Sequence, residues 1–187
     1  MSAKTSSVAL GAFLAAAALA ASGCSTTYPR RDPTGEVFPS VRGTALDGRS
    51  VSIPEDFAGE PVLLLIGYEM NTQFDLDRWL LGLAQAGVAV RTYELPTIPG
   101  LVPGMFAGSI DAGMRSGIPR EDWGSVITIY GDAKAVAAFT GNQPKLPGRI
   151  VLLDGSGRVA FFHDSGFSVR ALERLRETVQ ALGGVKS

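Results

Sequence analysis

The chain has 187 residues with 17 basic and 18 acidic side chains, so its formal net charge is −1. This balance excludes the basic surface that nucleic-acid binding requires. The sequence contains one cysteine and one histidine, which excludes a zinc or copper site built from several Cys and His ligands.

The N-terminus carries the three parts of a bacterial secretory signal. Lys4 gives a short basic start, residues 8–21 are uncharged and largely apolar, and small residues precede Cys24. The stretch Ala21-Ser22-Gly23-Cys24 matches the bacterial lipobox, so residues 1–23 are predicted to be a lipoprotein signal peptide. We expect cleavage between Gly23 and Cys24 and a diacylglycerol on the Cys24 sulfur. The alternatives are an ordinary signal peptide with a stray cysteine, or an uncleaved anchor.

A lipid anchor predicts a location in the cell envelope. Two or three acyl chains hold a protein stably, because each buried CH₂ contributes roughly 0.8 kcal/mol. Ser25 follows the cysteine where an aspartate would favour inner-membrane retention. We therefore expect a periplasm-facing protein on the outer membrane in preference to the inner one.

Residues 24–37 are predicted to be the lipidated N-terminus and a tether, since they combine prolines, a glycine and charges. Fully extended, such a tether would reach at most about 45 Å. Residues 38–187 are long enough for one domain with a core of its own.

The first part of this domain predicts a strand, a helix and a second strand. Residues 61–67 form a continuous apolar run typical of a strand buried on both faces. Thr72 and Asp75 have the spacing of a weak capping box, and apolar residues at helical spacing follow up to Gly87. Residues 88–93 are the second strand, and this order implies parallel pairing.

Prolines and glycines punctuate residues 96–119, where a short helix is possible. Residues 126–130 predict a third strand, followed by a short helix that Asp132 would cap. The second half ends with a hairpin of residues 150–153 and 159–162 around a DGSG turn, and with a helix that Ser168 caps.

The order of elements is βαβ, a connecting segment, and then ββα. It predicts an α/β fold of thioredoxin-like type, with helices on both faces of a mixed central sheet.

A family resemblance accompanies this order. The residues that carry it are Phe38-Pro39, Leu63-Leu64-Leu65-Ile66, Trp79-Leu80, Gly113-Met114-Arg115, Ile118-Pro119, Ile129-Tyr130-Gly131, Leu152-Leu153-Asp154, Gly157-Arg158-Val159 and Ser165-Gly166. At these scattered positions the chain resembles the mitochondrial ATP synthase assembly factor family, a thioredoxin-fold group related to peroxiredoxins. The resemblance implies a protein that helps a membrane subunit mature without a catalytic dithiol. That family's client is a subunit of an inner-membrane complex, so a location on the outer membrane would imply another client for this chain.

Redox members of the fold carry cysteines just after the first central strand, where the next helix begins and its dipole stabilises a thiolate. Here residues 68–73 read YEMNTQ, without a thiol. Glu69, Met70 and Asn71 are predicted to form a partner-binding face. The competing interpretation is a plain loop in which Asn71 caps the helix. Pro147 lies where the fold often has a cis-proline beside a substrate groove, but Pro147-Gly148 is equally a turn signal.

The sequence gives less support to a copper site, a catalytic triad or a phosphate-binding loop. Met70, Met105, Met114 and His163 could offer soft ligands for Cu(I), but methionines at apolar spacing are usually core residues. His163 would have to serve any catalytic triad, and no nucleophile elbow occurs. The DGSG turn at residues 154–157 is not followed by a helix that could bind phosphate.

The sequence therefore predicts a non-catalytic, membrane-tethered binding or assembly factor with an envelope protein as client and no cofactor. One alternative is a redoxin-type oxidoreductase relative that works through a partner's cysteine. Another is a structural envelope lipoprotein.

Overall fold

The computed structural model describes residues 26–99, 107–145 and 147–183. The predicted signal peptide and Cys24 lie outside these ranges. Within them, no helix combines the length and apolar character needed to span a membrane.

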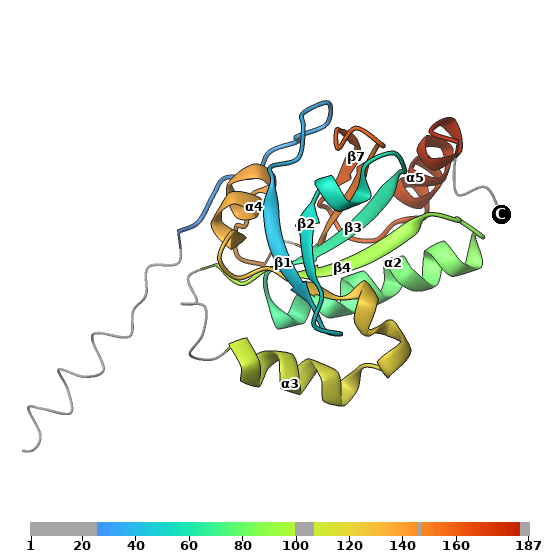
Figure 1. The fold of residues 1–187 in the computed structure, drawn as a ribbon. Coiled ribbons are helices and arrows are strands. Elements are labelled where there is room, and N and C mark those ends of the chain that lie inside the picture. Colours follow the sequence, from blue (N-terminus) through green and yellow to red (C-terminus); the bar gives the residue numbers. More distant parts are fainter. Residues whose placement is uncertain (1–25, 100–106, 146, 184–187) are drawn as a thin grey trace, which may run out of the picture.

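The centre of the domain is a four-stranded mixed sheet in the order β4-β3-β6-β7 (Figure 1). Strand β3 (Val62–Gly67) pairs in parallel with β4 (Arg91–Pro96) and antiparallel with β6 (Arg149–Leu153). Strand β7 (Val159–His163) completes the predicted hairpin with β6. All residues of β3 from Val62 to Ile66 are buried, as expected for an apolar strand covered on both faces.

A second, three-stranded sheet has the order β2-β1-β5. Its strands are β1 (Val41–Ala45), β2 (Ser50–Ile53) and the short β5 (Ile127–Thr128). Parallel bridges from Glu94 to Val126 and from Thr97 to Ile129 join it to the β4 side of the central sheet. The sequence analysis did not predict the β1–β2 hairpin.

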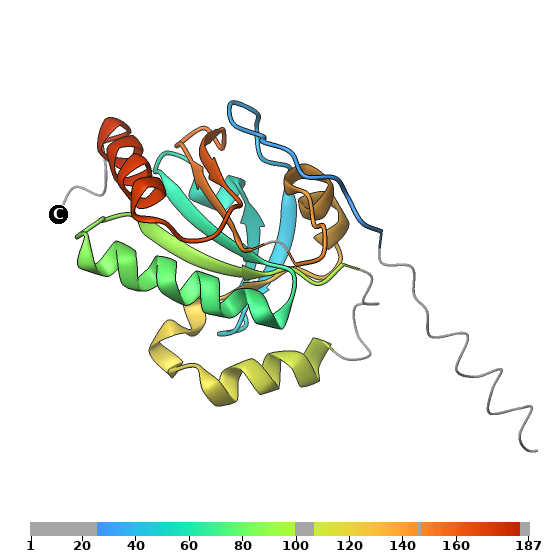
Figure 2. The same cartoon turned by 180° about the vertical axis from the view of Figure 1, so that it is seen from behind.

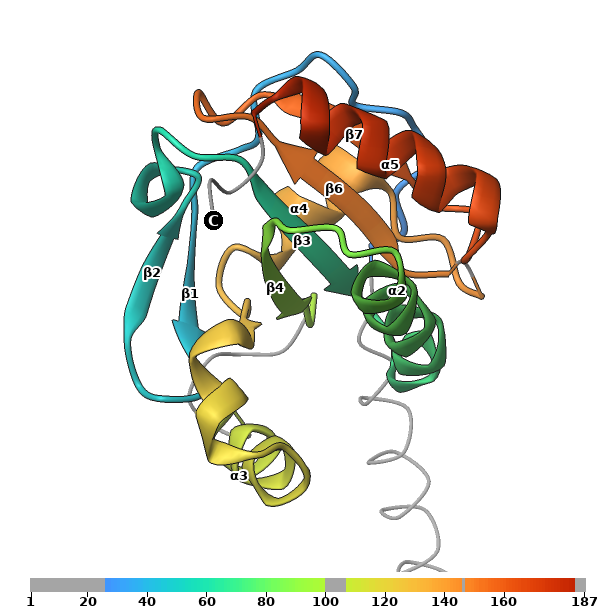
Figure 3. The same ribbon diagram turned by 90° about the vertical axis from the view of Figure 1, so that its right-hand side faces the viewer.

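One face of the central sheet is covered by two helices (Figures 2 and 3). These are α2 (Gln73–Gln85) and α5 (Val169–Ala181), and their buried side chains, Trp79 of α2 among them, pack with Leu63 and Leu65 of β3. Ser168 caps α5 as predicted, since its hydroxyl accepts a hydrogen bond from the Ala171 amide at 3.2 Å. Val169, the first residue of α5, is exposed.

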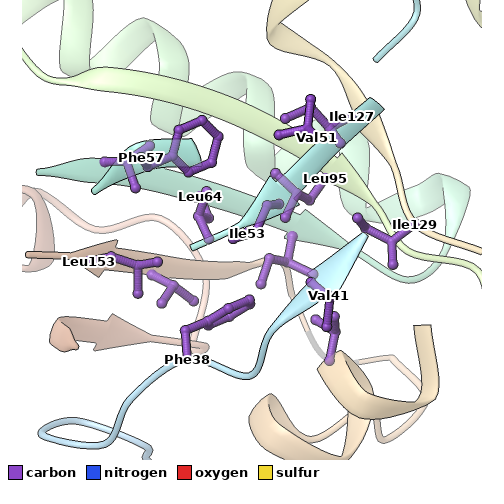
Figure 4. Packing of buried hydrophobic residues seen from close by; sticks show 14 of the residues in the cluster. Phe38, Val41, Val51, Ile53, Phe57, Leu64, Leu95, Ile127, Ile129 and Leu153 are labelled. Carbon is purple, nitrogen blue, oxygen red and sulfur yellow. The ribbon is translucent and has the colours of Figure 1, made fainter. Parts of the chain in front are cut away.

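The other face is covered by α4 (Ala133–Thr140) and the β1–β2 hairpin. Figure 4 shows how side chains from these elements meet those of β3, β4 and β6. Gly43 of β1 allows the side chains of Ile127 and Ile129 to lie against the β1 backbone, because a Cβ on residue 43 would lie 2.5 Å from their side-chain atoms. Helices therefore lie on both faces, and the predicted thioredoxin-like architecture is confirmed.

The remaining elements are helices that connect the strands, and one of them contributes Phe57 to the core. They are α3 (Ala107–Gly117) and three short 3₁₀ helices, η1 (Glu55–Phe57), η2 (Met70–Thr72) and η3 (Arg120–Ser125). The helix predicted within 96–119 is present as α3, and none of its residues is fully buried.

Two local predictions are corrected. The strand expected at 88–93 begins only at Arg91 and runs to Pro96, because residues 88–90 still belong to the turn that leaves α2 after Gly87. Asp132 precedes α4 but does not cap it with its side chain. Its carboxylate instead accepts a hydrogen bond from the Arg42 amide at 2.8 Å and so ties α4 to β1.

The stretch expected to be a tether packs against the domain. We call residues 26–37 the N-terminal strap; it runs past α4 and alongside β7 (Figures 1 and 2). Gly35 and Glu36 exchange backbone hydrogen bonds with Val159 at 2.8 and 2.9 Å, and Pro33 is buried. Residues 26–37 are therefore not a free tether.

Candidate functional site

The candidate site lies at the carboxyl end of β3, where the chain turns through η2 into α2. Gly67 ends the strand, and a Cβ at this position would lie 2.7 Å from the Thr72 hydroxyl oxygen. The absence of a side chain at Gly67 thus lets the turn fold back closely. This turn holds Glu69, Met70 and Asn71, the residues predicted to form a partner-binding face.

The predicted capping box is not formed. The Thr72 hydroxyl donates to the Glu69 carbonyl at 2.6 Å, and the Thr72 amide donates to the same carbonyl at 3.0 Å. Asp75 accepts a hydrogen bond from the Phe167 amide at 2.8 Å. The two residues therefore fix the turn and the loop before α5, and the alternative in which Asn71 caps α2 finds no support.

A groove with a volume of about 410 Å³ opens beside this turn. One wall comes from η2 and the first half of α2, and the opposite wall comes from the loops before β6 and before α5. The lining residues include Asn71, Phe74, Arg78, Lys145, Pro147, Ser165, Gly166 and Phe167. The structure thus brings the predicted residues Asn71 and Pro147 together across one groove.

Two large apolar side chains are exposed at this place. Met70 is 96 % exposed and Phe74, one helical turn further, is 74 % exposed. Met70 is therefore no core residue, and most of the Phe74 side chain is also left uncovered by the fold. Each would gain roughly 1.5–3 kcal/mol if a partner covered it fully. Glu69 is also exposed beside them and provides a negative charge.

Pro147 and Gly148 bring the β6 side of the groove close to α2. A Cβ on Gly148 would collide with the Leu76 side chain, so a glycine is needed where the loop crosses the helix. Pro147 is half-buried and contributes its ring to the groove. Because residue 146 is not described, the geometry of the peptide bond before Pro147 lies outside the described residues.

A buried cation stands directly behind the turn. Arg149, the first residue of β6, is 1 % exposed and its guanidinium lies 4.9 Å from the centroid of the Tyr68 ring. Its Nη1 donates to the Pro147 carbonyl at 2.6 Å. The Nε and Nη2 atoms are buried without a hydrogen-bond partner among the described residues. Burial lowers the pKa of Arg149 from its ordinary value.

Tyr68 is held between Arg149 and α4. Its hydroxyl shares a 2.7 Å hydrogen bond with the Thr140 hydroxyl. Burial raises the pKa of Tyr68 above its ordinary value, although the Thr140 hydrogen bond and the Arg149 charge act in the opposite direction. The phenol is consequently neutral at physiological pH, and it links the residue that follows β3 to α4.

The copper alternative gains no support from the geometry. Among the described residues, no three His, Cys, Asp or Glu side chains are grouped as metal ligands. His163 is half-buried in β7, where its Nε2 lies 2.7 Å from the Gly166 carbonyl oxygen and its ring packs edge-on against Trp79. This histidine therefore holds the loop before α5, while Met105 lies outside the described residues.

Several site residues were missed by sequence reasoning. Arg78, Lys145 and Ser165 reach the groove only because three distant segments meet there. Arg149 offered a weak signal, a single charge at the start of the otherwise apolar run 149–153. A charge at a strand end is ordinarily exposed, so its burial could not be predicted.

Comparison with known proteins identifies the fold. No protein-family model and no curated protein sequence matches the chain. Among solved structures, BsSco, a member of the Sco family of cytochrome c oxidase assembly proteins, is similar with a TM-score of 0.57 and 13% identity. The match covers 83% of this chain and 98% of that one.

Two further solved structures are similar to this chain in fold. A SCO1/SenC family lipoprotein from Bacillus anthracis matches with a TM-score of 0.54 and 13% identity, over 83% of this chain and 99% of that one. The thioredoxin domain of a thiol-disulfide oxidoreductase from Bacteroides vulgatus matches with a TM-score of 0.53 and 19% identity, over 80% and 99%. At these identities the likeness establishes a thioredoxin-like fold, and the resemblance to the ATP synthase assembly factors stays a prediction.

Proposed function

We propose that the protein is a lipid-anchored binding factor of the bacterial envelope that holds an extended segment of a client protein in the groove between α2 and the loops before β6 and α5. In this proposal, Cys24 carries the lipid, Ser25 directs the protein to the outer membrane, and the domain works without a cofactor.

One observation carries the proposal. Met70 and Phe74 expose large apolar surfaces beside a groove, and exposed apolar side chains rimmed by polar residues are typical of protein-binding sites. They lie at the end of the first central strand, where redox relatives of this fold carry their cysteines. The only cysteine of the chain is Cys24. At the position where those relatives carry cysteines, this chain therefore has exposed side chains that can contact a partner and no thiol.

The similar structures agree with an envelope role without establishing one. One is described as a cytochrome c oxidase assembly protein and another as a lipoprotein. These descriptions belong to those proteins, and they make a protein client the first possibility to test here.

The test compares two positions on the same helix. A photo-crosslinking amino acid replaces Phe74 in one variant and Leu81 in the other, and both are expressed in the native host. Leu81 is 59 % exposed but does not line the groove, so it is a matched control. We expect a reproducible client adduct from position 74 only. Equal adducts from both positions, or none from either, would contradict the proposal.

A substitution gives the same comparison without a probe. Phe74→Asp places a charge at the apolar rim and should weaken client binding about tenfold or more, as expected for a central interface residue. Leu81→Asp should leave binding unchanged. The two variants should have similar melting temperatures, because both side chains are exposed in the free protein.

The anchor is tested separately by intact mass. The mature protein should begin at Cys24 and carry a diacylglycerol, and Cys24→Ala should abolish both the lipid and the membrane association. An unmodified Cys24 thiol in the mature protein would contradict the lipid anchor. It would not contradict the proposed binding of a client in the groove.

A further inference from the structure

The N-terminal strap is bonded to the wall of the groove. Arg30 donates to both carboxylate oxygens of Asp164, from Nε at 2.6 Å and from Nη2 at 2.5 Å, and Nη2 also contacts the Ser165 hydroxyl. Ser165 lines the groove. The Asp164 side chain is only 8% exposed, so this bidentate ion pair is partly shielded from water and geometrically specific.

A second attachment lies on the loop that leads to the other lining segment. The Tyr28 amide donates to the Asn142 side chain at 2.7 Å, and the Asn142 side chain donates to the Thr26 carbonyl at 3.2 Å. The strap backbone lies so close to Gly141 that a Cβ there would be 2.6 Å from the Pro29 carbonyl oxygen. Three residues after Asn142, Lys145 enters the groove.

These contacts fix the distance between the anchor and the groove. Thr26 is two residues from Cys24, a span of at most about 7 Å. The free tether expected from the sequence would have let the domain move about 45 Å from the bilayer in any orientation. With the strap docked, the chain that leads to Cys24 therefore starts at Asn142, three residues before the groove residue Lys145.

We propose that the docked strap holds the groove at the membrane-facing pole of the domain, so that the occupant is an extended segment directly next to a membrane-spanning part of the client. This rests on the proposed function, since it assumes both the lipid on Cys24 and a client in the groove. The far pole contains the carboxyl end of α2, which runs away from the groove for its 13 residues (Figure 1).

The orientation is tested with two single-cysteine probes, which is possible because lipidation leaves no other thiol in the mature chain. Gln143→Cys places a fluorophore on the exposed loop between Asn142 and the groove, and Gln85→Cys places it at the far end of α2. Lipidated protein is reconstituted into phosphatidylethanolamine–phosphatidylglycerol vesicles that contain a headgroup-spin-labelled lipid as quencher.

We expect severalfold stronger quenching at position 143 than at position 85. Arg30→Ala should reduce this difference, because it releases the strap from Asp164 and Ser165. The control Glu36→Gln should keep it, since the Glu36 carboxylate pairs with Arg31 inside the strap itself. Equal quenching at both positions with the intact strap would overturn the proposal, as would stronger quenching at position 85.

The occupant is tested by mapping the adduct formed from position 74. We expect the crosslinked client peptide to lie directly beside a membrane-spanning helix or strand of an integral membrane protein. A specific adduct with a soluble protein, or with a part of the client far from the membrane, would overturn this inference and leave the proposed binding function standing. Absence of an adduct above that of position 81 would instead reject the binding function itself.

Discussion

Arg149 stacks on Tyr68 with its guanidinium carbon 4.9 Å from the ring centroid. Arg149 begins β6, and Tyr68 directly follows the end of β3, the strand next to β6 in the sheet. The stacking and one hydrogen bond to Pro147 are the only partners found for this cation among the described residues. A buried charge without a carboxylate partner is unfavourable for stability.

We therefore expect Arg149→Met to be neutral or to stabilise the domain by about 1 kcal/mol or more, since a side chain of similar length replaces a desolvated charge. Urea unfolding at neutral pH measures the effect. Tyr68→Phe, which removes only the hydroxyl bond to Thr140, is the control and should destabilise by about 1 kcal/mol. A clear loss of stability in Arg149→Met would mean that the stacking outweighs desolvation.

The strap should contribute to stability through Arg30. Arg30→Ala leaves the shielded Asp164 carboxylate without its guanidinium, so we expect a loss of about 1–3 kcal/mol. Arg31→Ala breaks an ion pair whose two side chains are 40% and 49% exposed and removes the guanidinium from the Phe139 ring, 5.5 Å away, and should cost less than about 1 kcal/mol. Thermal unfolding of both variants provides the comparison. Equal losses would show that the strap does not depend on Asp164.

The turn between β6 and β7 depends on one carboxylate. Asp154 accepts hydrogen bonds from the Ser156 amide at 2.8 Å, the Ser156 hydroxyl at 2.7 Å and the Arg158 amide at 3.0 Å. Burial by itself would raise the pKa of Asp154, but these hydrogen bonds outweigh it and hold the pKa below the ordinary value.

Asp154→Ala should therefore cost about 1–2 kcal/mol at neutral pH. Because the pKa is lower in the folded state, this stabilisation is complete above the ordinary carboxyl pKa and is lost as the pH falls through the folded value. The difference between the variant and the parent should shrink in acid. A difference that stays constant from neutral pH to pH values below both pKa values would contradict this account.

Glu94 of β4 should show the opposite pH dependence. Burial raises its pKa, the nearby Asp77 and Asp122 carboxylates add to this, and a 3.0 Å hydrogen bond from Gln73 opposes it. The charged form is thus disfavoured in the folded state, and its contribution to stability falls as the pH rises through the folded pKa.

We expect Glu94→Gln to raise the free energy of unfolding at neutral pH by about 0.5 kcal/mol and to have no such advantage well below the ordinary carboxyl pKa. Chemical unfolding at several pH values measures this. The control is Glu177→Gln, which removes one negative charge at an exposed position. It distinguishes the effect of burying the Glu94 carboxylate from the effect of changing the net charge of the protein. A stabilisation by Glu94→Gln that persists unchanged in acid would contradict the assignment.

Local sequence patterns correctly predicted the central strand β3, the β6–β7 hairpin and the start of α5. The apolar run of β3 is buried on both faces, the DGSG turn fixes the β6–β7 hairpin, and Ser168 starts α5. In each case the signal consists of neighbouring residues, so no distant contact was needed. The β1–β2 hairpin was not predicted, although Asp47-Gly48 between its five- and four-residue strands is a hairpin-turn signal.

The sequence by itself determined the number of thiols and the fold class of this protein. A single cysteine and the order of apolar runs are properties of the chain, whatever its conformation. The tertiary structure alone decided that the strap binds Asp164, that Arg149 is buried, and that Asn71, Lys145 and Ser165 share one groove. These facts depend on contacts between residues as much as 134 positions apart, and such contacts form only when the sheet brings the ends of its strands together.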